Sequence, residues 1–254
     1  MIKDDLLNSF LEYLSSKNIV LVDTFDDKLV SLNNIDESLV EAQLMLISEF
    51  HKSVMGYKGY MGKRLNNKTG SVVEQYKVHI KRLKRYVKNI RTNSAASNFE
   101  RALLKKGNDY IQRAEKCISE AFNAGYMDII QRSMNRTEIC FGNPDFTNLR
   151  KKEKLEIASL SKCCYNNLEM DCFTLLSKYK RKGIDLDWER LTESFCKYEG
   201  LPTSSSSFIL AMLSYPYEFM KCCDRYREKA KEWSEEEYED RLIKAMIKDG
   251  EVLF

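Results

Sequence analysis

The sequence predicts a predominantly α-helical fold. Leu, Lys, Glu and Met, which favour helices, are abundant, and runs of β-branched residues are few. The 254 residues contain only three prolines and ten glycines, and 43% of them are hydrophobic, so we expect a folded domain with a substantial core rather than a disordered or fibrous chain. The clearest helix places apolar residues on one face at alternating spacings of three and four: Val73, Tyr76, Ile80, Leu83, Val87 and Ile90.

Before that helix, the pattern predicts a helix, a short strand and another helix. Apolar residues between Leu6 and Leu14 recur at helical spacing. Residues 19–22 are typical of a short buried strand, and residues 39–51 return to helical periodicity. Glycines at positions 56, 59, 62 and 70 then predict a loop, which carries Tyr57, Tyr60 and Met61.

After that helix, the chain is expected to contain a second long helix, two short strands and more helices. The second long helix is predicted at residues 99–124, with Gly125 as its C-cap. Residues 138–141 and 155–158 resemble strands separated by a loop rich in turn-forming residues, which predicts a β-hairpin. The remaining helices are expected at about 167–182, 188–198, 207–233 and 234–247, the last beginning with a capping box of Ser234 and Glu237.

Charge and cysteine usage narrow the classes of function. The net charge of +3 does not call for nucleic acid or membrane as a partner. No stretch approaches the roughly 20 apolar residues of a membrane span, and the first residues lack an apolar signal region, so a cytoplasmic protein is expected. The eight cysteines contain no Cys-x-x-Cys spacing and are interpreted as small apolar residues. Cross-linking of the adjacent pairs Cys163-Cys164 and Cys222-Cys223 is the alternative.

The two histidines do not indicate a metal or hydrolase site. His51 and His79 lie 28 positions apart, which is not a metal-ligand spacing. They also give no basis for a Ser-His-Asp or Cys-His arrangement. His51 is therefore predicted to pack at the end of its helix, and neither a metal nor a cofactor is expected.

The segment from Glu138 to Leu149 resembles the catalytic loop of aminoglycoside phosphotransferase-like kinases. The family pattern is His-Gly-Asp, four variable residues, then Asn and an apolar residue. Gly142 matches the glycine, and Asn148 stands five residues after Asn143, which is the family spacing between the catalytic Asp and the metal-binding Asn.

Three further segments resemble the CotS group of spore-coat proteins within that superfamily. They are residues 48–53 followed by Gly56-Tyr57, residues 99–115, and Leu213-Ser214-Tyr215-Pro216 with Phe219-Met220-Lys221. The resemblance covers roughly residues 20 to 245. It implies the helical C-terminal lobe of a kinase-like fold at residues 35–254, preceded by a rudimentary helix and strand at residues 1–34.

The resemblance also implies that the catalytic positions are degenerate. Phosphoryl transfer needs a carboxylate that accepts the substrate proton and carboxylates that hold Mg²⁺. Asn143 occupies the position of the catalytic Asp and Phe141 that of the preceding His, while Ser159 and Ser161 lie in the metal-binding segment. Asn148 alone is retained, and Asp145 is the alternative source of a carboxylate. Asp171 matches a family Asp with a structural role. The residues before position 35 are too few for the family's five-stranded nucleotide-covering sheet.

These features predict a non-catalytic, pseudokinase-like binding or scaffold protein, with a spore-coat component as the more specific interpretation. The alternative is a divergent small-molecule kinase or nucleotide-binding sensor. A protein partner or self-association is expected. Nucleic acid is not, because no recognised nucleic-acid module is present.

One helix face is strongly basic, and it predicts either a solvated surface or a docking site for an acidic partner. The acidic C-terminal helix, residues 235–240, could pair with this face in another copy of the chain. The basic residues are Lys77, Lys81, Arg82, Lys84, Arg85, Lys88 and Arg91.

Overall fold

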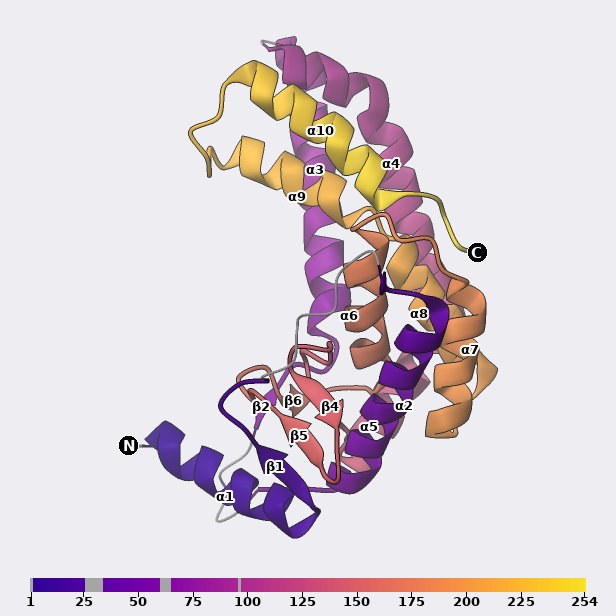
Figure 1. Cartoon of the computed structure of the whole chain (residues 1–254). Helices are drawn as coiled ribbons and strands as arrows, with labels where there is room; N and C mark the ends of the chain where they lie inside the picture. The colour runs from indigo at the N-terminus through magenta and orange to yellow at the C-terminus, as the bar shows by residue number, and fades with distance from the viewer. Residues whose placement is uncertain (1, 26–33, 60–64, 96) are drawn as a thin grey trace.

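The computed structural model describes residues 2–25, 34–59, 65–95 and 97–254. This part of the chain forms ten helices and six short strands (Figure 1). The helices are α1 (Ile2–Ser16), α2 (Glu37–Val54), α3 (Ser71–Asn93), α4 (Asn98–Asn123), α5 (Tyr126–Arg136), α6 (Glu169–Lys180), α7 (Trp188–Glu199), α8 (Thr203–Ser214), α9 (Tyr217–Arg227) and α10 (Glu235–Asp249). The strands are β1 (Ile19–Leu21), β2 (Asn66–Asn67), β3 (Ile139–Cys140), β4 (Leu149–Lys151), β5 (Leu155–Ile157) and β6 (Cys164–Tyr165). The prediction of a mainly helical fold with short strands is confirmed.

The strands form two three-stranded sheets, with the orders β1-β5-β4 and β2-β6-β3. Strands β4 and β5 are an antiparallel hairpin with Lys151 opposite Leu155, and β1 pairs in parallel with the other edge of β5. Strand β3 pairs antiparallel with β6, and β2 pairs in parallel with β6.

The predicted pairing of residues 138–141 with 155–158 is therefore wrong, although both strands exist. A tight turn, in which the Lys152 N–H donates to the Lys154 carbonyl at 3.1 Å, lets β4 take the place beside β5. Residues 149–151 looked like loop in the sequence because only Leu149 of the three is apolar. Strand β3 finds its partner beyond the hairpin instead.

Helix boundaries follow from local chemistry, and two of them differ from expectation. The predicted helix at residues 207–233 divides into α8 and α9, because Pro216 lacks an N–H and holds Tyr215 in an extended conformation with ψ of 131°. Helix α4 has Ala124 as its C-cap instead of the predicted Gly125, and Gly125, with a φ of 80°, is the N-cap of α5, a helix that the periodicity did not predict. The capping box at Ser234 and Glu237 is present at the start of α10.

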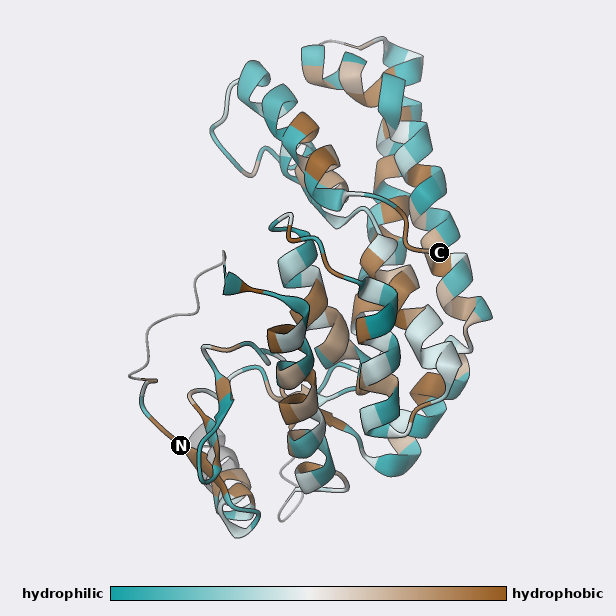
Figure 2. Cartoon of the chain, turned by 45° about the vertical axis from the view of Figure 1, so that its right-hand side comes forward, coloured by the Kyte–Doolittle hydropathy of each residue, from teal (hydrophilic) through white to brown (hydrophobic). Residues whose placement is uncertain are grey.

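Four helices form a bundle beside the rest of the fold. Helices α3 and α4 pack against each other, α9 packs on α3, and α10 packs on both α4 and α9 (Figure 1). Stacked aromatic rings contribute to this packing. The ring centroids of Phe99 in α4 and Tyr226 in α9 lie 4.0 Å apart, and those of Tyr76 in α3 and Tyr215 lie 3.6 Å apart. Figure 2 shows mainly hydrophilic residues on the outer turns of this part of the molecule.

Of the remaining helices, α1 packs on β1 and α2 packs on β3 and β4, whereas α5 packs on α4 and α6 and α7 pack on α8. Their buried side chains belong to one hydrophobic core with those of the bundle. Arg132 of α5 donates to Glu138, next to β3, at 3.0 Å and to Glu169 of α6 at 2.8 Å, and both carboxylates are fully buried. Because each buried carboxylate is paired, this contact fixes β3 between two helices.

Several smaller sequence expectations also have outcomes. All eight cysteines are free thiols and buried, which confirms their interpretation as small apolar residues. Tyr57 packs in the core, 4.9 Å from Phe10. Tyr60 and Met61 lie outside the described residues. Within the described segments, no helix combines the length and apolar character needed to cross a membrane.

Candidate functional site: the loop between β3 and β4

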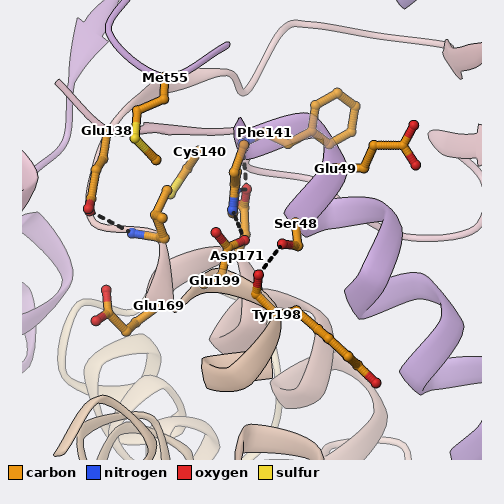
Figure 3. A network of polar contacts seen from close by, with 12 residues as sticks. Ser48, Glu49, Met55, Glu138, Cys140, Phe141, Glu169, Asp171, Tyr198 and Glu199 are labelled. Atoms are coloured by element: carbon orange, nitrogen blue, oxygen red, sulfur yellow. Dashed lines mark hydrogen bonds and ion pairs between the residues drawn. The ribbon is translucent and has the colours of Figure 1, made fainter. Parts of the chain in front are cut away.

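The loop at residues 141–148 begins at the end of β3 and is fixed there by Asp171 of α6. One oxygen of this buried carboxylate accepts the Phe141 N–H (Figure 3). The other oxygen accepts the Gly142 N–H at 2.7 Å. Two backbone donors on one carboxylate set the direction in which the chain enters the loop. This geometry agrees with the structural role that the resemblance implies for Asp171.

A buried histidine supports Asp171 from behind. His51 of α2 places Nε2 at 2.9 Å from Asp171 and Nδ1 at 2.7 Å from Glu199, at the end of α7. All three side chains are at most 1% exposed. Burial alone would lower the pKa of His51, but the charge of Glu199 and the hydrogen bonds to both carboxylates raise it to about 10. His51 is therefore a buried imidazolium that links three helices beneath the loop.

No local sequence pattern indicates this network. His51 does lie in the last turn of α2 and is packed, as expected. Its two carboxylate partners, however, are 120 and 148 positions away in the chain, so no local spacing reveals them.

The same cluster contains three groups of the kind that bind metals. Donor atoms of His51, Cys140 and Asp171 lie within 4.8 Å of one another. The arrangement does not fit a bound metal, because both ring nitrogens of His51 face carboxylates as proton donors. Burial also raises the pKa of the Cys140 thiol well above its ordinary value, and the thiol donates to the Asn167 carbonyl at 3.1 Å. A metal ligand would have to be a neutral imidazole and a thiolate.

The pKa values of the two histidines should lie on opposite sides of 6.5, the ordinary pKa of a histidine side chain. His51 should remain protonated above pH 8, whereas burial lowers the pKa of His79 against the pull of Asp224. Because the folded pKa of His51 exceeds its unfolded value, its stabilisation is complete below pH 6.5 and is lost as the pH rises towards 10. Two-dimensional NMR of the imidazole nitrogens between pH 5 and pH 10 measures both values, with His79→Gln assigning the signals. Titration of His51 near 6.5 would contradict the network.

Gly142 allows the loop to pack closely on the segment after β5. Its φ is +78°, and a Cβ atom there would lie 2.3 Å from the Lys162 carbonyl oxygen. Only glycine avoids both the strained φ and this clash. The preceding residue, Phe141, is fully buried, with its ring 5.0 Å from that of Phe50 in an edge-to-face contact. The position of the family's histidine is thus part of the core.

The other predicted site positions meet at Asn148. Asn143 is exposed, and Asn148 is buried. The Asn148 amide nitrogen donates to the Asn143 carbonyl and to the Ser159 carbonyl, each at 3.1 Å. Ser159 and Ser161 are exposed, and their hydroxyls lie 3.1 Å apart. The structure therefore brings the catalytic-loop and metal-segment positions together. The side chains at these positions that could offer an oxygen to a metal are amides and hydroxyls, which carry no negative charge.

Asp145 is engaged within the loop. Its carboxylate accepts from the Thr147 N–H at 2.9 Å, from the Thr147 hydroxyl and from the Lys178 ammonium group. Burial alone would raise the pKa of Asp145, but the hydrogen bonds from Lys178 and Thr147 hold it below the ordinary value. It is the only carboxylate in residues 141–148, and residues 158–162 contain none.

The basic residues lie on α3, in the helical bundle, rather than in this loop. Lys77, Lys81, Lys84 and Arg85 line a groove between α3 and α4. Arg82 points to the other side of the helix, where it lies 3.8 Å from Glu228, beside α9. The seven basic residues are thus not one uniform surface.

Comparison with known proteins identifies the fold. No family model matches the sequence, and no curated protein matches it. In structure, the chain is similar to an aminoglycoside phosphotransferase from Alicyclobacillus acidocaldarius, with a TM-score of 0.60 and 14% sequence identity. The match covers 83% of this chain and 62% of that one. The chain therefore has a kinase-like fold that it shares with an aminoglycoside phosphotransferase.

Proposed function

We propose that this chain is a non-catalytic, pseudokinase-like binding or scaffold protein. The observation that carries the proposal is the exposed amide side chain of Asn143. Asn143 directly follows Gly142, whose N–H donates to Asp171, so the backbone at this position is held in place. By resemblance this position belongs to the carboxylate that accepts the proton of the attacking hydroxyl. An amide cannot accept that proton at neutral pH.

The surroundings of Asn143 support the same conclusion. The side-chain oxygens of Asn148, Ser159 and Ser161 are neutral, whereas Mg²⁺ in phosphoryl-transfer sites is held by one or two carboxylates. Asp145 is bound to Lys178, so recruiting it would leave the ammonium group without its partner. A loop that is firmly held but carries no free carboxylate suits a structural or binding role.

A setting in the spore coat is the more specific form of this proposal. It rests on the three segments of this chain that resemble the CotS group. Tyr215 and Phe219, which belong to the third of these segments, are buried in the core of this chain. Binding to another protein, or to a second copy of the chain, would be the activity in that setting.

The alternative function, a divergent small-molecule kinase or nucleotide sensor, has one observation in its favour. Asn148 still joins the loop to the segment at Ser159, so these two parts of the site remain in contact. A nucleotide held there would have to bind without an anionic metal ligand from either segment.

A turnover assay tests the proposal. Formation of ADP from Mg²⁺ and ATP, with and without hydroxyl-bearing acceptors such as aminoglycosides, should be the same for the wild type, Asn148→Ala and a buffer control. Asn143→Asp should also remain inactive, because it restores a proton acceptor without a metal ligand. Turnover by the wild type that Asn148→Ala abolishes would show a working kinase.

A further inference from the structure

The groove between α3 and α4 combines an apolar floor with a basic rim. Its volume is about 530 Å³, which lies within the roughly 300–1,000 Å³ that ligand-binding clefts usually enclose. Ile80 of α3 and Ile118 of α4 contribute the apolar surface. Glu115 of α4 is the only carboxylate among the residues that line the groove. Four basic residues of α3 form its rim: Lys77, Lys81, Lys84 and Arg85.

Much of the basic charge along this groove has no partner within the described residues. Lys84 pairs with Glu115, and Lys77 pairs with Glu74 at 2.9 Å. The other basic residues on this side of α3 are Lys81, Arg85, Lys88 and Arg91. In the described chain, no carboxylate oxygen lies within 4.0 Å of their charged nitrogens. Spacings of three and four residues place most of them on the same stripe of the helix as Lys77 and Lys84.

Helix α10 presents a face with the opposite properties. Its buried face contains Tyr238, Leu242 and Ala245, which pack on the bundle. On the opposite side of the helix, at 100° per residue, two acids are followed by two exposed isoleucines. Ile243 is 48% exposed and Ile247 is 75% exposed. The outward stripe comprises Glu236, Asp240, Ile243 and Ile247, with the exposed Lys244 at its edge, one turn after Asp240.

These two surfaces complement each other in charge and in polarity. A phosphate polymer would satisfy the lysines but would leave the isoleucine floor uncovered and would meet Glu115. An acidic amphipathic helix satisfies both, with its apolar residues on Ile80 and Ile118 and its acids on the unpaired lysines. Helix α10 has this pattern, and the side chains of its two outward isoleucines, Ile243 and Ile247, remain exposed in the described chain.

We propose that copies of this chain associate head to tail, with the outward face of α10 of one copy in the α3–α4 groove of the next. Helices α3 and α10 lie at opposite corners of the four-helix bundle, so the two surfaces face different directions and each copy can bind one neighbour with its groove and another with its α10. The inference deepens the proposed scaffold function by naming its partner as a second copy. It is tested separately, since self-association does not depend on the loop at Asn143.

Sedimentation equilibrium from micromolar to millimolar concentration tests the proposal. The wild type should form oligomers whose mean size grows with concentration, and Lys81→Glu with Lys88→Glu should raise the dissociation constant of the contact about ten-fold or more. Glu236→Lys with Asp240→Lys should have a similar effect. The matched control is Lys152→Glu with Lys154→Glu, which makes the same charge change in the exposed β4–β5 turn and should behave as the wild type.

Mixing the two charge-reversed proteins provides the sharpest outcome. Each alone should be mainly monomeric, and the equimolar mixture should recover association, because it offers one wild-type contact and one contact with its charges exchanged. A wild type that stays monomeric at millimolar concentration would overturn the proposal, as would equal weakening by the control variant. Salt-dependent binding of a single-stranded oligonucleotide by a monomeric wild type, lost in Lys81→Glu with Lys88→Glu, would instead make a polyanion the occupant.

Discussion

Replacing His51 by phenylalanine should lower the free energy of unfolding by roughly 3–5 kcal/mol at pH 7. The ring of phenylalanine fills a similar volume but cannot donate to Asp171 or Glu199. Both carboxylates would remain almost completely buried without their shared cation. Glu199 already has one buried oxygen without a hydrogen-bond partner among the described residues, so it has no second donor to replace His51. Urea denaturation followed by circular dichroism measures the loss.

His79→Gln is the matched control for this experiment. His79 is partly exposed and lies 3.7 Å from Asp224, a contact that solvent screens. Its replacement should therefore cost less than about 1 kcal/mol. Similar small losses for both histidines would contradict the view that His51 is the ionic support of the loop.

Gly142→Ala should be the second large effect, with a loss of roughly 2–4 kcal/mol in the free energy of unfolding. The added methyl group would stand 2.3 Å from the carbonyl oxygen of Lys162, so the backbone of the loop or of the facing segment must move. Part of the loss comes from the positive φ alone, which alanine adopts at a cost of about 1 kcal/mol. Thermal or urea unfolding of the variant gives the total.

Gly183→Ala separates the two contributions. Gly183 has a φ of +74°, close to that of Gly142, but nothing lies within 4 Å of the added Cβ position. Its replacement should show the φ cost alone, about 1 kcal/mol. If both variants lose the same stability, the contact between Gly142 and Lys162 contributes nothing to holding the loop.

Local sequence chemistry predicted most of the helices. The apolar stripe of α3, the capping box of α10 and the strand at residue 19 each depend on neighbours a few positions away, and each is found. Helix α5 was missed because only part of its apolar surface is buried: Met127 and Met134 are more than 60% exposed. The strand pairing could not be predicted from periodicity, because it is decided by which short segments meet in three dimensions.

The candidate site divides in the same way. The spacing of Asn143 and Asn148 indicated a loop of this type, and the two residues are indeed joined by a hydrogen bond. The contacts that hold the loop could not be derived from the sequence, because His51, Asp171 and Glu199 come from three helices that are distant in the chain. The Lys178 partner of Asp145 also lies 33 positions away, so the engaged state of that carboxylate required the structure.

Calorimetric titration of the protein with ATP in the presence of Mg²⁺ measures whether the loop between β3 and β4 still holds a metal-bound nucleotide. We expect no saturable heat at millimolar nucleotide, because residues 141–148 and 158–162 offer no free carboxylate to hold the metal. Saturable, Mg²⁺-dependent binding that Asn148→Ala abolishes would contradict it and would show that the loop still works as a nucleotide site.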